Sequence, residues 1–322
     1  MSETGKKAIY EFFGVKICGT ISLIPCILLI IIYIIKKKLT LSMYINFNLC
    51  ITAIFYSISG LFPKMKKNDL NNFSCHFQVV LGTTGDISIL LWTGTISVIG
   101  TLSYIYQETI EKNENKMKLI VTIIVYGIVI IFNICFQGLG EIDVIENNYY
   151  CWINNYYVKM SYTIFIVIIF IVNIIANVIL MIEVNKIKKK VNDNENLIKK
   201  LNKFSCILWK YIIALILIFL SNIIHFIQHI KSKFNNDEYQ ELPIIFDVLL
   251  QSFNYLKGFI VCFVYTYNDE FYDDLFNMCK CNFDKIKDDK EINLTNTEET
   301  DKSYYNAIDF FDPLSTDIEI PV

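Results

Sequence analysis

The most prominent pattern in the chain is a series of long apolar segments separated by short polar stretches. Each segment has about 20 residues, the length that a helix needs to cross the hydrocarbon core of a bilayer. Apolar residues follow one another without the alternation that a membrane-spanning strand requires. Because lipid offers the backbone no hydrogen bonds, the segments are expected to be α-helices. Seven segments fit this description: Ile17–Ile35, Ser42–Leu61, Phe77–Tyr104, Leu119–Gln137, Ile164–Ile182, Cys206–Ile230 and Ile244–Tyr267.

The sequence therefore predicts an all-α fold, a bundle of seven transmembrane helices over residues 17–267. Residues 1–16 are expected to form an external N-terminal segment. Residues 268–281 are expected to form a short amphipathic helix on the membrane surface. Its apolar positions recur at helical spacing: Phe271, Tyr272, Leu275 and Met278. The acidic, polar residues 282–322 lack such periodicity, which predicts a disordered cytoplasmic tail.

The placement of lysines predicts which side of the bundle faces the cytoplasm. Cytoplasmic loops of membrane proteins carry an excess of positive charge. With the N-terminus outside, the cytoplasmic loops and their flanks hold 14 lysines and the external side holds 9. We therefore expect a multi-pass plasma-membrane protein with an external N-terminus and a cytoplasmic C-terminus.

Several of the ten cysteines lie where covalent chemistry is expected. Cys75 precedes the third segment and Cys151 lies in the loop after the fourth, both on the external, oxidising side, where a disulfide is allowed. Two free thiols are the alternative. Asn72 begins an Asn-Phe-Ser sequon on the same side and is a glycosylation candidate. Cys279 and Cys281 follow the predicted amphipathic helix and are candidates for S-palmitoylation, with ordinary cytosolic thiols as the alternative.

Charged side chains inside the apolar segments are candidate functional residues, because each costs roughly 2.5–3.5 kcal/mol in hydrocarbon. Asp86 and Lys257 lie at similar depths, roughly 16 and 21 Å from the external ends of their helices. We therefore predict an ion pair between the third and seventh segments. The pair is either a structural lock or a functional element, namely the floor of a ligand cavity or a switch that breaks on activation.

Further polar residues gather on the last two segments. Four side chains at spacings of four, three and three share one face of the seventh helix: Asp247, Gln251, Asn254 and Lys257. This face either lines a ligand cavity or holds the helix to its neighbours by hydrogen bonds. His225 and His229 lie one turn apart in the sixth segment, a spacing also found in zinc sites. Because no Glu-containing helix motif accompanies them, we predict no metal and favour hydrogen bonding to a ligand or loop, or an ordinary interfacial position.

Composition changes this picture in one respect, because all 29 basic residues are lysine. The chain therefore cannot use an arginine switch or grip a phosphate with a bidentate guanidinium. Its formal net charge of −3 offers no basic field, so no nucleic-acid partner is expected.

Three regions carry recognisable motifs. They are the third segment with Cys75, Gly85, Leu91-Trp92-Thr93 and Tyr104, the loop motif Cys151-Trp152-Ile153, and the seventh-segment ending Lys257-Gly258-Phe259, Tyr265, Tyr267 and Asn268. In this order and spacing they resemble the slime-mould cyclic-AMP receptor family, and the likeness covers the layout of the whole seven-span core. One departure is Asp269, which stands where the family usually has a proline after its Tyr-Asn.

The resemblance implies a G-protein-coupled receptor that is not an enzyme and needs no cofactor. Such a receptor binds an extracellular small-molecule ligand and signals to a heterotrimeric G protein, which would dock at the lysine-rich stretch Glu183–Lys203. Cyclic AMP is one candidate ligand, but the arginines of the family's inner face and outer sixth helix are missing. The identity of the ligand therefore does not follow from the resemblance.

Other classes of membrane protein have less support in the sequence. A transporter or channel would be favoured by internal repeats, which the sequence does not show. A seven-span metal-dependent hydrolase would need His225 and His229 to hold zinc. An opsin-like protein would bind retinal through Lys257, but the motifs around this lysine do not support it.

Overall fold

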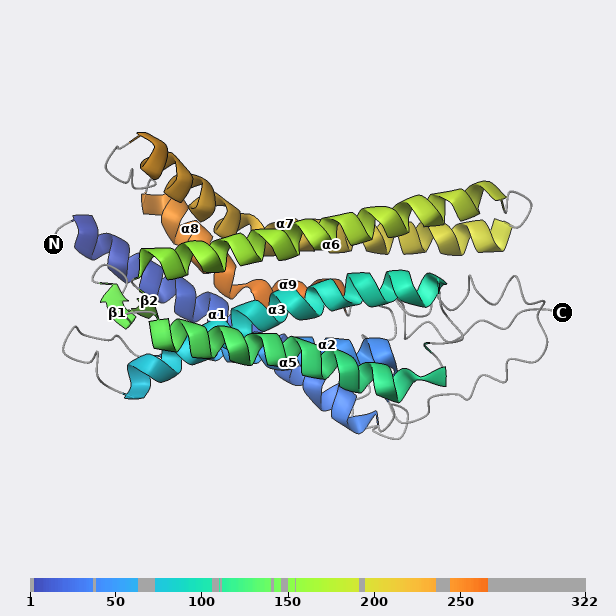
Figure 1. Ribbon diagram of the computed structural model, residues 1–322, viewed down its shortest axis with the longest axis horizontal. Helices are drawn as coiled ribbons and strands as arrows, with labels where there is room; N and C mark the ends of the chain where they lie inside the picture. Colours follow the sequence, from blue (N-terminus) through green and yellow to red (C-terminus); the bar gives the residue numbers. More distant parts are fainter. Residues whose placement is uncertain are drawn as a thin grey trace.

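The computed structural model describes residues 3–36, 39–62, 73–105, 110, 112–139, 142–145, 150–153, 155–190, 195–235 and 244–265. In this part of the chain the predicted all-α class is confirmed, and one small hairpin joins the helices (Figure 1). The elements are α1 (Glu3–Ile35), α2 (Leu41–Leu61), α3 (Phe73–Ile105), α5 (Glu114–Leu139), β1 (Ile142–Ile145), β2 (Tyr150–Ile153), α6 (Tyr156–Lys190), α7 (Glu195–Asn235), α8 (Ile244–Tyr255) and α9 (Lys257–Tyr265).

Five stretches in the described helices are long and apolar enough to cross a membrane, which makes the chain a multi-pass membrane protein. They are Phe13–Ile35, Leu41–Leu61, Phe73–Ile99, Glu114–Gly138 and Met160–Lys186. These stretches coincide with the first five segments predicted from the sequence. Within the sixth predicted segment, α7 holds a shorter apolar stretch, Leu208–Leu220.

The helices differ from the predicted segments at three places. α1 begins at Glu3, so the predicted N-terminal segment is largely helical. α6 continues to Lys190 and α7 begins at Glu195, so most of the stretch Glu183–Lys203 is also helical. The seventh segment is not one continuous helix, because it is divided at Leu256. Hydrophobicity shows where a helix can lie in lipid. It does not show that a helix continues beyond the lipid through polar residues, or that a helix is broken within the lipid.

The two ends of the bundle are built differently. The β1–β2 hairpin lies at the same end as the start of α1, whereas α6 and α7 meet at the opposite end (Figure 1). The strands are antiparallel and place Val144 opposite Cys151. The predicted disulfide is present and joins Cys151 to Cys75 at the start of α3, with a Cα–Cα distance of 5.4 Å. It therefore fastens the hairpin to the bundle.

The buried core and the exposed apolar surface lie on different helices. α3 is enclosed along much of its length, and its Trp92 packs edge-on against Tyr44 of α2 and Tyr126 of α5. By contrast, α5 and α6 expose many large apolar side chains, including Ile120, Ile123, Ile131, Ile134, Ile168, Ile171 and Ile175. An apolar surface of this extent is not expected to face water. We expect it to face lipid.

Glycines allow α3 to approach its neighbours closely. A Cβ atom on Gly85 would lie 2.5 Å from the backbone nitrogen of Tyr56 in α2. A Cβ atom on Gly94 would lie 2.5 Å from Oδ1 of Asn173 in α6. Small residues commonly allow such crossings between membrane helices. The positions of α2 and α6 around α3 therefore depend on these glycines.

We expect Gly85→Ala to destabilise the folded protein, because its methyl group would meet backbone atoms that cannot rotate away. Overpacking of this kind costs about 1–3 kcal/mol, which a lower Tm in detergent would report. Gly127→Ala in α5 is the matched control, because a Cβ there meets nothing within 4 Å. Its Tm should be unchanged or higher, since alanine favours helix more than glycine does. Equal Tm values for the two variants would contradict the close crossing.

Candidate functional site

A buried ion pair joins α3 to α9. Lys257 Nζ lies 2.5 Å from Asp86 Oδ1, as the sequence predicted. Lys257 is fully buried and Asp86 is only 4% exposed. Removing one partner from such a pair leaves a charge with neither water nor a counter-ion, which is strongly destabilising. Each of the two charges is therefore tolerated only because the other is present.

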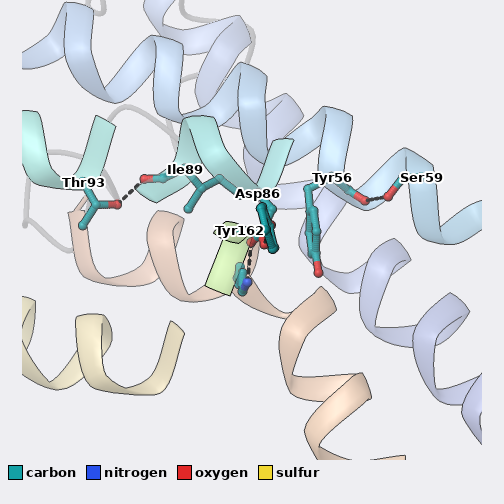
Figure 2. Close-up of polar contacts among 7 residues, drawn as sticks. Tyr56, Ser59, Asp86, Ile89, Thr93 and Tyr162 are labelled. Atoms are coloured by element: carbon teal, nitrogen blue, oxygen red, sulfur yellow. Dashed lines mark hydrogen bonds and ion pairs between the residues drawn. The ribbon is translucent and has the colours of Figure 1, made fainter. Parts of the chain in front are cut away.

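Tyrosines from three further helices complete the cluster, and Figure 2 shows two of them, Tyr56 and Tyr162, beside Asp86. The Tyr162 hydroxyl of α6 donates a hydrogen bond to Asp86 Oδ2, so both carboxylate oxygens are engaged. Lys257 Nζ lies 5.1 Å from the ring centroid of Tyr56 in α2, within the range of a cation–π contact. Tyr56 in turn stacks on Tyr255 of α8, with ring centroids 4.9 Å apart. The cluster thus draws on five helices, α2, α3, α6, α8 and α9.

This arrangement is suited to holding one relative position of the helices. Replacing a buried ion pair by apolar residues is often neutral or stabilising, so the pair is weak evidence for added stability. Its geometry is nevertheless demanding, because a shift of α9 against α3 must break the contact between Lys257 and Asp86. Both side chains are buried, so the pair is closed to solvent in this structure. The chemistry that it supports is that of a conformational lock or switch.

The remaining predicted site residues lie on α7 and α8 or outside the described residues. Asn254 is buried on α8. Asp247 and Gln251 lie on α8, and His225 and His229 lie on α7, but their side chains lie outside the part that the structure describes. Within the described residues, no group of three or more His, Cys, Asp or Glu side chains could hold a metal ion. Three predicted sites lie wholly outside those residues: Asn72, Cys279 and Cys281.

The two charges were predictable from the sequence, whereas the tyrosines around them were not. The chain has 20 tyrosines, so a tyrosine within an apolar segment does not stand out. Charge in hydrocarbon is expensive enough to mark Asp86 and Lys257 individually. The sequence offered one weak signal for Tyr56 and Tyr162. Each has a hydroxyl group, and a buried tyrosine hydroxyl usually needs a hydrogen-bond partner.

The fold and the buried cluster define a multi-pass helical membrane protein in which an ion pair links α3 to α9. The chain belongs to the slime mold cyclic AMP receptor family, whose model matches residues 4–283. The match spans all described helices except for Glu3, the first residue of α1, and confirms the predicted family, the class of cyclic-AMP-receptor-like G-protein-coupled receptors. No curated protein sequence matches the chain.

Proposed function

We propose that the chain is a seven-span receptor that transmits an extracellular small-molecule signal across the plasma membrane to a heterotrimeric G protein. The family match over residues 4–283 is the observation that carries this proposal. In this scheme α7 is the sixth span, and α8 together with α9 is the seventh. The apolar stretch of α7 and the apolar composition of α9 support this assignment.

The proposed orientation places the N-terminus outside and the C-terminus in the cytoplasm. The Cys75–Cys151 disulfide supports it, because disulfides persist on the oxidising side of the plasma membrane. The hairpin that carries Cys151 lies at the end of the bundle where α1 begins (Figure 1). The opposite end, where α6 and α7 meet, is rich in lysine, as expected of a cytoplasmic face.

We assign the Asp86–Lys257 pair to the resting state of the receptor. A ligand stabilises whichever conformation it binds better, so a ligand that favours a displaced α9 would shift the population away from the paired state. α8 lies at the proposed external end of the bundle (Figure 1). It carries Asp247, Gln251 and Asn254, which together with His225 and His229 of α7 remain the proposed ligand contacts.

The cytoplasmic ends of α6 and α7 are the proposed docking region for the G protein. Lys188 Nζ of α6 donates a hydrogen bond to Ser205 Oγ of α7 at 2.6 Å, and partial burial lowers the pKa of Lys188 below its usual value. Lys186 pairs with Glu183 at 2.6 Å on the same stretch. The contact between Lys188 and Ser205 joins the two helices whose separation would admit a G-protein helix, whereas the pair of Lys186 and Glu183 lies within α6.

The segments outside the described residues keep their sequence-based proposals. Asn72 is proposed as an external glycosylation site. Residues 268–281 are proposed as an amphipathic helix with lipidated Cys279 and Cys281, and residues 282–322 as an acidic cytoplasmic tail.

The proposed ligand is a small molecule, and cyclic AMP remains one candidate. A phosphate on the ligand would have to be held by lysine, histidine or backbone donors, because the chain contains no arginine. The family therefore supports the receptor class more strongly than it supports a particular ligand.

A cell-based ligand screen tests the proposed function. In cells that carry a sensor of G-protein dissociation, a panel of small molecules including cyclic AMP should contain at least one that activates the wild-type chain. Asp86→Asn and Lys257→Met should alter the response to that ligand at equal surface expression. Cys135→Ser is the control, because this free thiol is exposed and lies outside the cluster. Ion or solute flux in liposomes, with no G-protein response to any ligand, would support a transporter instead.

A further inference from the structure

The proposed seventh span is broken although its residues 244–265 contain no proline. α8 ends at Tyr255 and α9 begins at Lys257. Between them, the Leu256 amide donates to the Phe253 carbonyl at 3.0 Å, an i−3 bond that is tighter than the i−4 bond of an α-helix. Apart from proline, sharp kinks commonly arise where a side chain inserts into the helix hydrogen-bond ladder.

The inserted side chain is Ser22 of α1. In a continuous helix the Phe259 amide would donate to the Tyr255 carbonyl. Instead, Ser22 Oγ accepts a hydrogen bond from the Phe259 amide at 3.3 Å and donates one to the Tyr255 carbonyl at 2.5 Å. Ser22 is fully buried. One hydroxyl group therefore bridges two backbone groups that would bond to each other in a continuous helix.

The packing around the break holds α9 tightly against α1. A Cβ atom on Gly258 would lie 3.1 Å from Ser22 Cβ and 3.2 Å from Cys26 Sγ, so the glycine lets the two helices meet. One turn further along each helix, Cys26 Sγ lies 3.2 Å from Cys262 Sγ. The contact therefore extends from the break along the first part of α9.

We propose that Ser22 is a positioning residue that holds the seventh span open at Leu256 and thereby places Lys257 opposite Asp86. Lys257 is the first residue of α9, so the direction of α9 after the break fixes where its ammonium group lies. Without the Ser22 hydroxyl, the Tyr255 carbonyl and the Phe259 amide would each lose a hydrogen bond in a water-free interior, at considerable cost. Re-forming the helix bond between them removes this cost, straightens the span and moves Lys257 away from Asp86.

Cross-linking of two native cysteines measures this geometry. Molecular iodine oxidises two neighbouring thiols to a disulfide, releases their two protons and is itself reduced to iodide. Cys50 also lies within hydrogen-bond reach of both thiols, so every variant carries Cys50→Ser. In this otherwise wild-type background, iodine should join Cys26 to Cys262. Ser22→Ala should lower the yield of that bond, measured by peptide mass spectrometry, towards the background of Cys262→Ser. Ser22→Thr keeps the hydroxyl group and should keep the bond. Ser88→Ala is the matched control, because this buried serine hydroxyl has no hydrogen-bond partner among the residues that the structure describes.

A second variant keeps the test decisive if Ser22→Ala alone folds poorly. Ser22→Ala combined with Phe259→Pro cannot re-form the helix bond, because proline has no amide hydrogen and its ring clashes with the carbonyl four residues earlier. The break should therefore persist, and the cross-link yield should return towards the wild-type value. An unchanged yield in Ser22→Ala, or no recovery in the double variant, would overturn the positioning role.

The expected effect of Ser22→Ala on signalling rests on the proposed receptor function and is measured in a separate experiment. Ser22→Ala should raise ligand-independent G-protein activation in the wild-type background. In the background of Asp86→Asn with Lys257→Met it should add nothing, because the pair that it positions is already absent. Equal added activation in both backgrounds would overturn the link between Ser22 and the pair. Altered cross-linking without G-protein activation in any variant would count against the receptor function and leave the structural role of Ser22 standing.

Discussion

Lys257→Met is expected to destabilise the folded protein by about 3–5 kcal/mol, the usual cost of removing one partner of a buried ion pair. The methionine approximates the length of the lysine stem but leaves Asp86, which is only 4% exposed, without a counter-charge. The hydrogen bond that the Tyr162 hydroxyl donates to this carboxylate would remain. The measurement is the free energy of unfolding in detergent micelles, supported by the fraction of protein that reaches the cell surface.

Two further variants distinguish the effect of breaking the ion pair from a general effect of losing a lysine. Adding Asp86→Asn to Lys257→Met removes the stranded charge, so the double variant should recover most of the lost stability. Lys186→Met is the matched control, because its ion pair with Glu183 is solvent-exposed and such pairs contribute little. If Lys257→Met proved as stable as Lys186→Met, the buried pair would not be a determinant of the fold.

Removing the disulfide by Cys75→Ser with Cys151→Ser is expected to lower stability by about 2–5 kcal/mol, the typical cost of losing a native bridge. The bond closes a loop between residues 76 positions apart, so its loss enlarges the unfolded ensemble considerably. In the folded state, loss of the disulfide frees the hairpin from the start of α3. The hydrogen bond from the backbone amide of Cys151 to Gln78 Oε1, 3.2 Å long, does not depend on the sulfur atoms and would remain. The Tm in detergent reports the change.

Cys135→Ser provides the control for this prediction, because Cys135 is an exposed free thiol on α5. Its Tm should match that of the wild-type protein. Treatment of the wild-type protein with a reductant should reproduce the effect of the double variant without any substitution. A wild-type Tm that is insensitive to reductant would show that the bridge does not stabilise the fold.

The fold was predictable from the sequence where one physical requirement dominates. A helix in lipid needs a long run of apolar residues, and this requirement located the apolar stretches of the first five spans to within a few residues. The cost of charge in hydrocarbon likewise singled out Asp86 and Lys257, which form the predicted pair. Cys75 and Cys151 were predictable partners because both were assigned to one oxidising side.

The features that sequence reasoning missed depend on contacts between distant segments. The Ser22 hydroxyl that bridges the break at Leu256 lies more than 200 residues earlier in the chain. Tyr162 becomes part of the site only because α6 brings its hydroxyl to Asp86. The hairpin at Ile142–Ile145 and Tyr150–Ile153 is too short for an alternating pattern to stand out. Hydrophobic periodicity and the cost of burying a charge are properties of a single segment. They do not show which distant side chains the fold brings together.

The most direct test of the central claim is ligand-independent nucleotide exchange on a panel of heterotrimeric G proteins, catalysed by purified receptor in lipid nanodiscs. The claim is that the Asp86–Lys257 pair holds a G-protein-coupled receptor in its resting state. The double variant Asp86→Asn with Lys257→Met, which is expected to fold, should then catalyse exchange faster than the wild-type protein on at least one G protein. An exchange rate equal to that of the wild-type protein, from a double variant of wild-type stability, would contradict it.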